Sequence, residues 1–174
     1  HKSDLWFYLR KNGKSYFKTL ADLITSHGSS VLDVGCGEAL VLKYLPKDFK
    51  YTGIDLSDFI ITKNYQKYPR NYLSFIVSDM YKPNVTGWYD IILFAGTFTI
   101  LHKTEILDLV RLYAAKYKPN YILIADLKKV DLSLVEKNFQ VVGKTNYYFP
   151  LIKKPLPAGT PEQINNRQIL LIKV

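Results

Sequence analysis

A glycine-rich turn follows the first apolar run of the chain, where Asp33 precedes Gly35, Cys36 and Gly37 in the segment VLDVGCGEAL. Glycine has no Cβ, so the backbone of this turn can bend tightly and let a ligand approach within contact distance. Backbone amides at the start of a following helix have no intrahelical partner and would face that ligand. The turn therefore predicts a cofactor-binding site.

A second acid stands at a distance that suits the binding of a ribose. Asp55 ends the apolar run KYTGIDL, 22 residues after Asp33. A carboxylate at the tip of a second strand can accept hydrogen bonds from both ribose hydroxyls, as the acid about 20 residues on does in dinucleotide folds. The dinucleotide fingerprint also needs a small residue at its third glycine position, where this chain has Leu40. NAD and FAD are therefore disfavoured.

The turn resembles motif I of the class I S-adenosylmethionine-dependent methyltransferases, whose pattern is acid-x-Gly-Cys-Gly-x-Gly. Asp33, Gly35, Cys36 and Gly37 match that pattern, and Ala39 replaces its last glycine. Alanine is the smallest side chain after glycine, so the departure is mild, although its methyl group could crowd the methionine end of the cofactor. The resemblance implies a methyltransferase that uses S-adenosylmethionine.

Further motifs similar to those of the family follow in order up to about Asp126. Asp55 stands where the family's second-strand acid binds the ribose, and Asp79 with Met80 stands where an acid and an apolar residue clamp the adenine. For Asp79 a turn or helix-capping aspartate is the alternative. The resemblance thus implies a cofactor site at Asp33, Gly35, Cys36, Gly37, Asp55, Leu56, Asp79, Met80 and Ala95.

An aromatic-acid pair opens the fourth strand of the family, and the stretch WYDIILF supplies Trp88, Tyr89 and Asp90 at that place. This match extends the resemblance along the chain. For Asp90 itself we favour a structural role over a role in binding.

The resemblance places the acceptor contacts after the fourth strand, in FAGTFTILHK. A methyl group on a sulfonium leaves readily, so the protein's main tasks are to hold both reactants close and to choose the nucleophile. A general base helps only if the nucleophile must lose a proton early. Thr97 and Phe98 are candidate substrate ligands, and His102 is a candidate catalytic base or substrate ligand. A surface histidine that caps a helix is the alternative for His102.

The type of acceptor is narrowed by a missing signature. Enzymes that methylate exocyclic amines of nucleobases or glutamine carry Asn-Pro-Pro-Tyr or Asp-Pro-Pro-Tyr after the fourth strand. This chain has Ala95 to Phe98 at that place, so it lacks the signature. The segments left to hold an acceptor are aromatic and basic, and this suits a small anionic metabolite, a nucleotide-sugar or a flipped base. We select Tyr16, Tyr147 and Arg167 as substrate ligands, from a set that also includes Trp6, Phe7, Tyr8, Phe17, Tyr148, Phe149, Lys153 and Lys154. Core packing is the alternative for the aromatic members.

Alternating strand and helix signals surround these motifs. Apolar runs predict strands over 30–35, 50–56, 73–79, 89–95, 120–127, 140–149 and 168–174. Helical spacing or length predicts helices over 16–24, 38–45, 57–67, 104–117 and 132–139. The pattern indicates an α/β fold: a Rossmann-like, doubly wound sheet of seven strands, mostly parallel with an antiparallel C-terminal strand.

The length of 174 residues suits one domain. We expect a single methyltransferase domain over 1–174, made of an N-terminal helical cap over 1–28, a cofactor-binding core over 29–126, and a C-terminal helix and strand pair with a Pro-rich loop over 127–174. The single Cys36 and the lack of a Cys/His cluster predict no metal site and no internal disulfide. No run approaches the roughly 18 apolar residues of a membrane span, so we expect a cytoplasmic protein, either a monomer or a homodimer.

The formal charge of +9 permits an anionic partner such as RNA, although lysine is spread along the whole chain. Three hypotheses follow. The favoured one is methylation of an oxygen or nitrogen of a small metabolite, sugar or glycan precursor. The alternatives are an RNA or protein methyltransferase and a non-catalytic cofactor-binding module, and the latter fits the intact Asp55 and Asp79 poorly.

Overall fold

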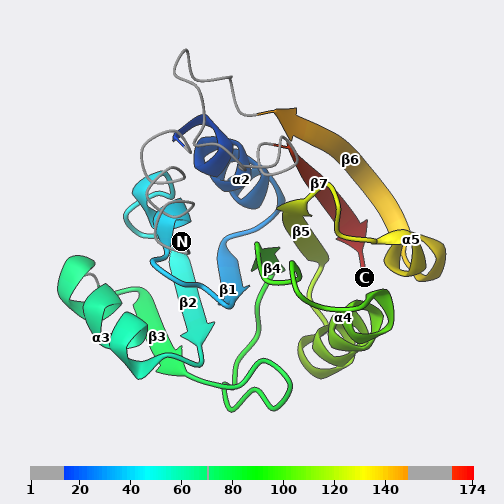
Figure 1. Cartoon of the computed structure of the whole chain (residues 1–174). Coiled ribbons are helices and arrows are strands. Elements are labelled where there is room, and N and C mark those ends of the chain that lie inside the picture. Colours follow the sequence, from blue (N-terminus) through cyan, green and yellow to red (C-terminus); the bar gives the residue numbers. More distant parts are fainter. Residues whose placement is uncertain (1–13, 70, 149–165) are drawn as a thin grey trace, which may run out of the picture.

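The structure, a computed structural model, describes residues 14–69, 71–148 and 166–174. Within these ranges seven strands form one sheet, in the order β3-β2-β1-β4-β5-β7-β6 (Figure 1). The strands are β1 (Ser30–Val34), β2 (Lys50–Asp55), β3 (Leu73–Val77), β4 (Ile91–Ala95), β5 (Tyr121–Leu127), β6 (Gln140–Tyr148) and β7 (Asn166–Lys173). β1 to β5 pair in parallel, and β7 runs antiparallel to both β5 and β6. The predicted fold class is confirmed.

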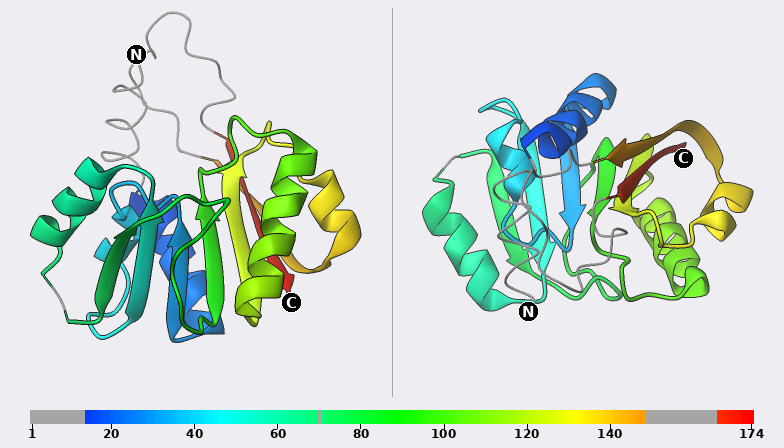
Figure 2. Two further views of the ribbon diagram at one scale, coloured as in Figure 1. Left: turned by 90° about the horizontal axis from the view of Figure 1, so that it is seen from below. Right: turned by 45° about the horizontal axis from the view of Figure 1, so that its top comes forward.

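Helices cover both faces of this sheet (Figure 2). They are α2 (Lys14–His27), the 3₁₀ helix η1 (Leu40–Lys43), α3 (Asp58–Lys67), α4 (Lys103–Tyr117) and α5 (Ser133–Asn138). The helix predicted over 38–45 is therefore only one short 3₁₀ turn. Ala39 has φ 49° and ψ 44°, which is left-handed backbone that a right-handed helix cannot contain. Pro46 then disfavours helical backbone at the residue before it.

The core lies in two layers, one on each side of the sheet. Side chains alternate along each strand, so that Val31 and Leu93 pack under α2 while Leu32 and Phe94 pack under α4. All four of these side chains are buried. Because the central strands are covered on both faces, their sequences are nearly continuous apolar runs, as in other parallel sheets.

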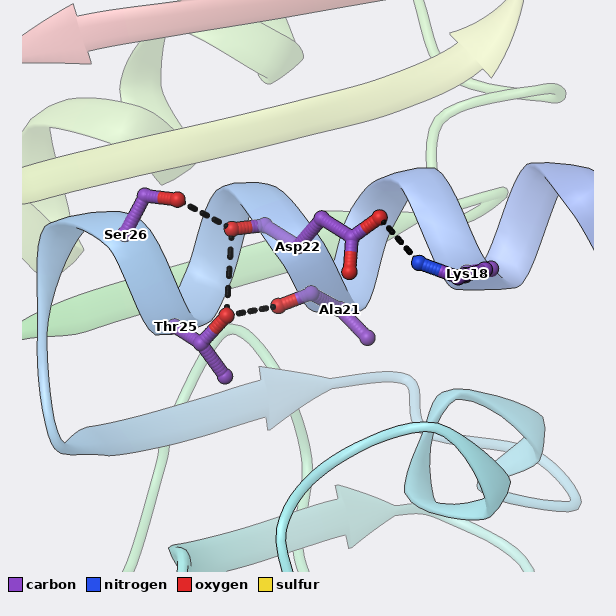
Figure 3. A network of polar contacts seen from close by, with 5 residues as sticks. All are labelled: Lys18, Ala21, Asp22, Thr25 and Ser26. Carbon is purple, nitrogen blue, oxygen red and sulfur yellow. Dashed lines mark hydrogen bonds and ion pairs between the residues drawn. The ribbon is translucent and has the colours of Figure 1, made fainter.

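The outer side of α2 is polar and is held by local contacts (Figure 3). Lys18 Nζ lies 2.7 Å from Asp22 Oδ2, one helical turn further on. In the last turn, Ser26 Oγ donates to the carbonyl of Asp22 at 2.6 Å, and Thr25 Oγ1 donates to the carbonyl of Ala21 at 2.9 Å. α2 thus presents a solvated face on one side and its apolar residues to the sheet on the other.

Asp90 joins the beginnings of β1 and β4 at the amino edge of the sheet. Its Oδ2 accepts hydrogen bonds from the amides and hydroxyls of both Ser29 and Ser30, at 2.8 to 3.1 Å. Burial acts to raise the pKa of Asp90, but these hydrogen bonds outweigh it and hold the pKa below its usual value. A Cβ at Gly28 would lie 2.4 Å from the Cβ of Asp90, so only glycine fits there. These contacts support the structural role that we favoured for Asp90.

None of the helices in the described ranges is both long enough and apolar enough to cross a membrane.

Candidate active site

The turn after β1 stands at the carboxyl edge of the sheet, where open α/β folds bind their ligands. The amides of Gly35 and Cys36 both donate to the carbonyl of Ile54 in β2, at 2.8 and 2.9 Å. Gly35 has φ +71° and Gly37 has φ +50°, in the left-handed region that glycine tolerates best. The neighbouring strand therefore fixes the turn through two of its backbone amides.

Asp55, at the end of β2, is bonded to the same turn. Its Oδ2 accepts a hydrogen bond from the amide of Gly37 at 3.0 Å, and its Oδ1 accepts one from the amide of Ser57 at 3.0 Å. The side chain is partly exposed. Each carboxylate oxygen can accept a second hydrogen bond, so both ribose hydroxyls could bind to a carboxylate that is already held in place.

Asn64 of α3 braces the turn from the other side, and sequence reasoning missed it. Its Nδ2 donates to the carbonyl of Gly37 at 2.6 Å, and its side chain is buried. The available signal was its spacing, because Asn64 lies three residues after the buried Ile61 and so on the same face of the helix. A polar residue on the apolar face of a helix indicates a specific partner.

Asp33 is buried in β1 with one oxygen paired and one free. The hydroxyl of Tyr51 donates to Asp33 Oδ2 at 2.6 Å, whereas Oδ1 has no hydrogen-bond partner among the described residues. Burial raises the pKa of Asp33 to about 7, although the Tyr51 hydrogen bond acts to lower it. A buried carboxylate with an unused oxygen suits a cationic or donating group of a ligand.

A hollow begins at Asp33 and extends past the turn to the end of β4. Its walls include Gly35 and Cys36 from the turn, Ala95 from β4, and Glu38 just before η1. Burial raises the pKa of the Cys36 thiol, so this thiol is a packing group and not a nucleophile. The structure thus brings Asp33, Gly35, Cys36 and Ala95 together around one space.

Tyr16 and Arg167, two of the residues predicted to contact the acceptor, also line this hollow, together with Phe17. The Tyr16 hydroxyl donates to the carbonyl of Ala125 at 3.2 Å, and burial raises its pKa. The ring of Tyr147 from β6 packs edge-on against Tyr16, with centroids 5.5 Å apart. The other residues of the aromatic and basic set, apart from Phe17, lie outside the described residues or have side chains that are not described: Trp6, Phe7, Tyr8, Tyr148, Phe149, Lys153 and Lys154.

The loop after β4 is held by contacts that sequence reasoning did not foresee. Thr97 Oγ1 donates to the carbonyl of Val34 at 2.8 Å, so its hydroxyl ties the loop to the end of β1. Asp126, fully buried at the end of β5, accepts hydrogen bonds from the amide of Phe98 at 2.8 Å and from Thr99 Oγ1 at 3.0 Å. The ring of Phe98, which was predicted to contact the substrate, is fully buried and packs against Phe94 in the core.

His102 lies in a second hollow, apart from the residues that line the first. It is exposed and is the N-cap of α4, with its amide donating to Glu105 Oε2 at 2.9 Å and its Nδ1 2.9 Å from Thr104 Oγ1. Phe98 and Lys129 line the same hollow. The structure therefore gives His102 a capping position at the carboxyl edge of the sheet, beside the loop that was predicted to contact the acceptor.

The residues predicted to contact the adenine lie beyond the ends of β2 and β3. Asp79 is exposed, and its Oδ1 accepts a hydrogen bond from the amide of Tyr81 at 2.8 Å, which is a turn role that leaves its other oxygen available. Met80 is partly buried and packs against the α4 layer of the core. Leu56 is 74% exposed. Leu56 and Asp79 thus present apolar and acidic surface that a base could cover.

Among the described residues, no group of three or more His, Cys, Asp or Glu side chains is placed to hold a metal ion.

Comparison with known proteins agrees with the fold and the turn. The family model described as "Methyltransferase domain" matches residues 31–120, which is more than half of the chain. The chain therefore belongs to this family of class I methyltransferases and is an S-adenosylmethionine-dependent enzyme. A search of curated protein sequences finds no match.

Solved structures of methyltransferases share the fold at low sequence identity. The N-methyltransferase NodS from Bradyrhizobium japonicum WM9 has a TM-score of 0.72 at 13% identity, over 94% of this chain and 96% of that chain. Magnesium protoporphyrin IX methyltransferase from Synechocystis PCC 6803, with bound SAM, has a TM-score of 0.69 at 14% identity, over 95% and 82%. The tRNA (uracil-54, C5)-methyltransferase of Pyrococcus abyssi has a TM-score of 0.66 at 17% identity, over 91% of this chain and 37% of that chain.

The residues at the carboxyl edge fit S-adenosylmethionine. The unused Asp33 Oδ1 suits the ammonium of its methionine part, and the open backbone of Gly35 and Gly37 permits close approach. Asp55 has lone pairs for the ribose, and Asp79 with Leu56 suits the adenine. All of these groups come from the turn or from strand ends, which a rigid sheet holds in register.

Proposed function

We propose that this methyltransferase acts on an oxygen or nitrogen of a small metabolite, sugar or glycan precursor. The supporting observation is that the chain's own α2 and β7 form the acceptor-side wall of the hollow, through Tyr16 and Arg167. The ring of Tyr147 packs edge-on against Tyr16. A space bounded so closely by aromatic and cationic side chains suits a small acceptor better than a protein or RNA chain.

In this proposal, the groups that hold the cofactor are Asp33, Asp55, Asp79 and the turn at Gly35 and Gly37. When bound, the cofactor supplies a methyl group activated on a sulfonium. The protein holds the acceptor in line with that group and excludes water, and this positioning supplies most of the rate.

His102 is proposed as the base or acceptor ligand at the carboxyl edge. His102 and Phe98 line the second hollow, which shares no lining residue with the first and lies next to the loop that Asp126 holds in place. The role therefore requires an acceptor that extends from the first hollow to the second. A base there would accept the proton from an acceptor hydroxyl or amine in the transition state. Thr97 acts by positioning, because its hydroxyl is used in the bond to Val34.

We further propose that the enzyme works in the cytoplasm, as a monomer or a homodimer. The only cysteine, Cys36, is free and partly buried, which is in keeping with a reducing compartment.

The test is a calorimetric titration with S-adenosylmethionine and S-adenosylhomocysteine, with NAD as the control, followed by transfer of a labelled methyl group to pools of small anions and to total RNA. We expect micromolar binding of the first two ligands, no binding of NAD, and labelling of a small molecule. Labelling of RNA that weakens steeply with salt would favour the RNA alternative. Absence of any labelling, despite binding, would favour the non-catalytic module.

A further inference from the structure

Arg167 is a buried cation without an anionic partner in the part of the chain that the structure describes. It is the second residue of β7, where it pairs in register with Leu127 and Tyr147, and it is 5% exposed. Its Nε is buried and has no hydrogen-bond partner, and none of the ion pairs found there includes it. Burying an unpaired charge is strongly unfavourable unless something compensates it.

The ring of Tyr16 compensates this charge only in part. The guanidinium carbon lies 5.7 Å from the centroid of that ring, at the outer range of a cation–π contact. Such a contact uses the flat face of the guanidinium and leaves its N–H groups to be satisfied in the plane. A planar fork of N–H donors matches the two oxygens of a carboxylate or a phosphate.

Arg167 also lines the candidate active site. A Cβ at Gly96, directly after β4, would lie 3.7 Å from Arg167 Nη1, so the fork stands over the end of that strand. Arg167 lines the same hollow as Asp33 and Gly35. One hollow therefore contains a carboxylate with a free oxygen in one wall and a cation with a free N–H in another.

Two anions could use this cation: the carboxylate of the cofactor's methionine part and an anionic group of the acceptor. Asp33 and the turn stand where the cationic end of the cofactor fits, and a guanidinium alone would repel a sulfonium. An anionic acceptor is attracted both by the guanidinium of Arg167 and by the sulfonium of the cofactor. It neutralises Arg167 while it approaches the methyl group. Arg167 comes from β7, where it pairs with Tyr147 and its guanidinium lies near the ring of Tyr16. The other predicted cofactor contacts come from the turn after β1, from the ends of β2 and β3 and, for Ala95, from β4.

We propose that Arg167 is the specificity residue for the acceptor and binds a carboxylate or phosphate group of it, so that the enzyme methylates small anionic molecules. This inference rests on the proposed function. It narrows the acceptor class to anions and identifies the guanidinium of Arg167 as the group that binds them.

The test uses the full chain saturated with S-adenosylhomocysteine and three probes at constant ionic strength: benzoate, inorganic phosphate and the neutral benzamide. The variants are Arg167→Met, which keeps the length of the side chain without its charge, and Lys128→Met, which removes an exposed cation near the same end of β5. Calorimetry and the melting temperature report binding. We expect benzoate or phosphate to bind the wild type and Lys128→Met, to bind Arg167→Met at least about tenfold more weakly, and benzamide not to discriminate between them.

Two further measurements separate this role from others. The melting temperature of ligand-free Arg167→Met should be unchanged or higher, because the variant removes an uncompensated buried charge; a lower value would assign Arg167 a structural role and overturn the proposal. A tenfold loss of S-adenosylhomocysteine affinity in Arg167→Met, with unchanged affinity for methylthioadenosine, would assign Arg167 to the cofactor's own carboxylate and also overturn it. If wild-type protein does not bind S-adenosylhomocysteine, the proposed function itself fails; if it does but no anion effect depends on Arg167, only this inference fails.

Discussion

The backbone amide of Gly37 donates a hydrogen bond of 3.0 Å to the carboxylate of Asp55, so the turn after β1 and the acid at the end of β2 hold each other in place. The carbonyl of the same glycine accepts a hydrogen bond from Asn64 of α3. The ribose acid is therefore oriented before any ligand arrives, and little conformational entropy remains to be lost on binding.

Replacing Asp55 should remove the ribose contact while leaving the fold intact. We expect Asp55→Ala to weaken S-adenosylhomocysteine binding by at least about tenfold, the loss that follows from one charge-assisted hydrogen bond. Calorimetry measures the affinity, and circular dichroism checks the fold. Asp58→Asn removes an exposed carboxylate three residues further on and should bind normally. Equal affinities for both variants and the wild type would remove Asp55 from the site.

Ala39 should gain stability on replacement by glycine. Its φ of +49° is strained for a residue with a Cβ, at a cost of about 1 kcal/mol. Ala39→Gly should therefore raise the melting temperature by roughly 2 to 4 °C and leave cofactor affinity equal or slightly tighter. Lys118→Gly is the matched control, because Lys118 has φ +45° at the end of α4, where the cofactor does not bind. A large loss of affinity in Ala39→Gly alone would show that its methyl group contacts the cofactor.

The two acids of the motif region were predictable from the sequence because their spacing is local. A tight turn needs Gly35 and Gly37, and Asp55 lies beside them because the next strand in the sequence, β2, pairs directly with β1. The contacts that hold these groups were not predictable, since they depend on strand order. Asp126 reaches the loop after β4 only because β5 is the neighbour of β4, and no local pattern reports that pairing.

At the short η1 helix, sequence reasoning predicted an element that the structure does not form in full. The apolar spacing of 38–45 predicts a full helix, but Ala39 has left-handed backbone and Pro46 disfavours helical backbone at Leu45. The left-handed backbone at Ala39 is imposed by the turn around it, so the propensity of the segment is overridden by a neighbouring constraint. Arg167 was selected as a cation in one of the segments left to hold an acceptor. That it has no anionic partner among the described residues is visible only in the structure.

Asp33 should give the protein a distinctive dependence of stability on pH. Burial raises the pKa of Asp33 from 3.8 to about 7, so the folded state binds this proton more tightly than the unfolded state does. Its contribution to the free energy of unfolding is therefore present at low pH and is lost as the pH rises from about 4 to about 7. Asp33→Asn removes this titration, so the stability of the variant relative to the wild type should increase across that window.

Urea denaturation at several pH values measures this difference, with Asp48→Asn as the control for the loss of one exposed negative charge. Parallel profiles for Asp33→Asn and the wild type would contradict the assignment. A cationic group beside Asp33 favours its ionised form. The affinity of the wild type for S-adenosylhomocysteine should accordingly rise with pH over the same range, and that of Asp33→Asn should change less.

His102 combines a capping position with a proposed catalytic role, and two substitutions separate them. Asn is a better helix N-cap than Ala, so His102→Asn should retain the stability that His102→Ala loses, about 1 kcal/mol. If His102 accepts the acceptor's proton, both variants should lower kcat by about 100-fold and leave cofactor affinity unchanged. Single-turnover transfer of a labelled methyl group, as a function of pH, measures this. Full activity in His102→Asn would show that the ring serves only to begin α4, and the reaction would then depend on positioning alone.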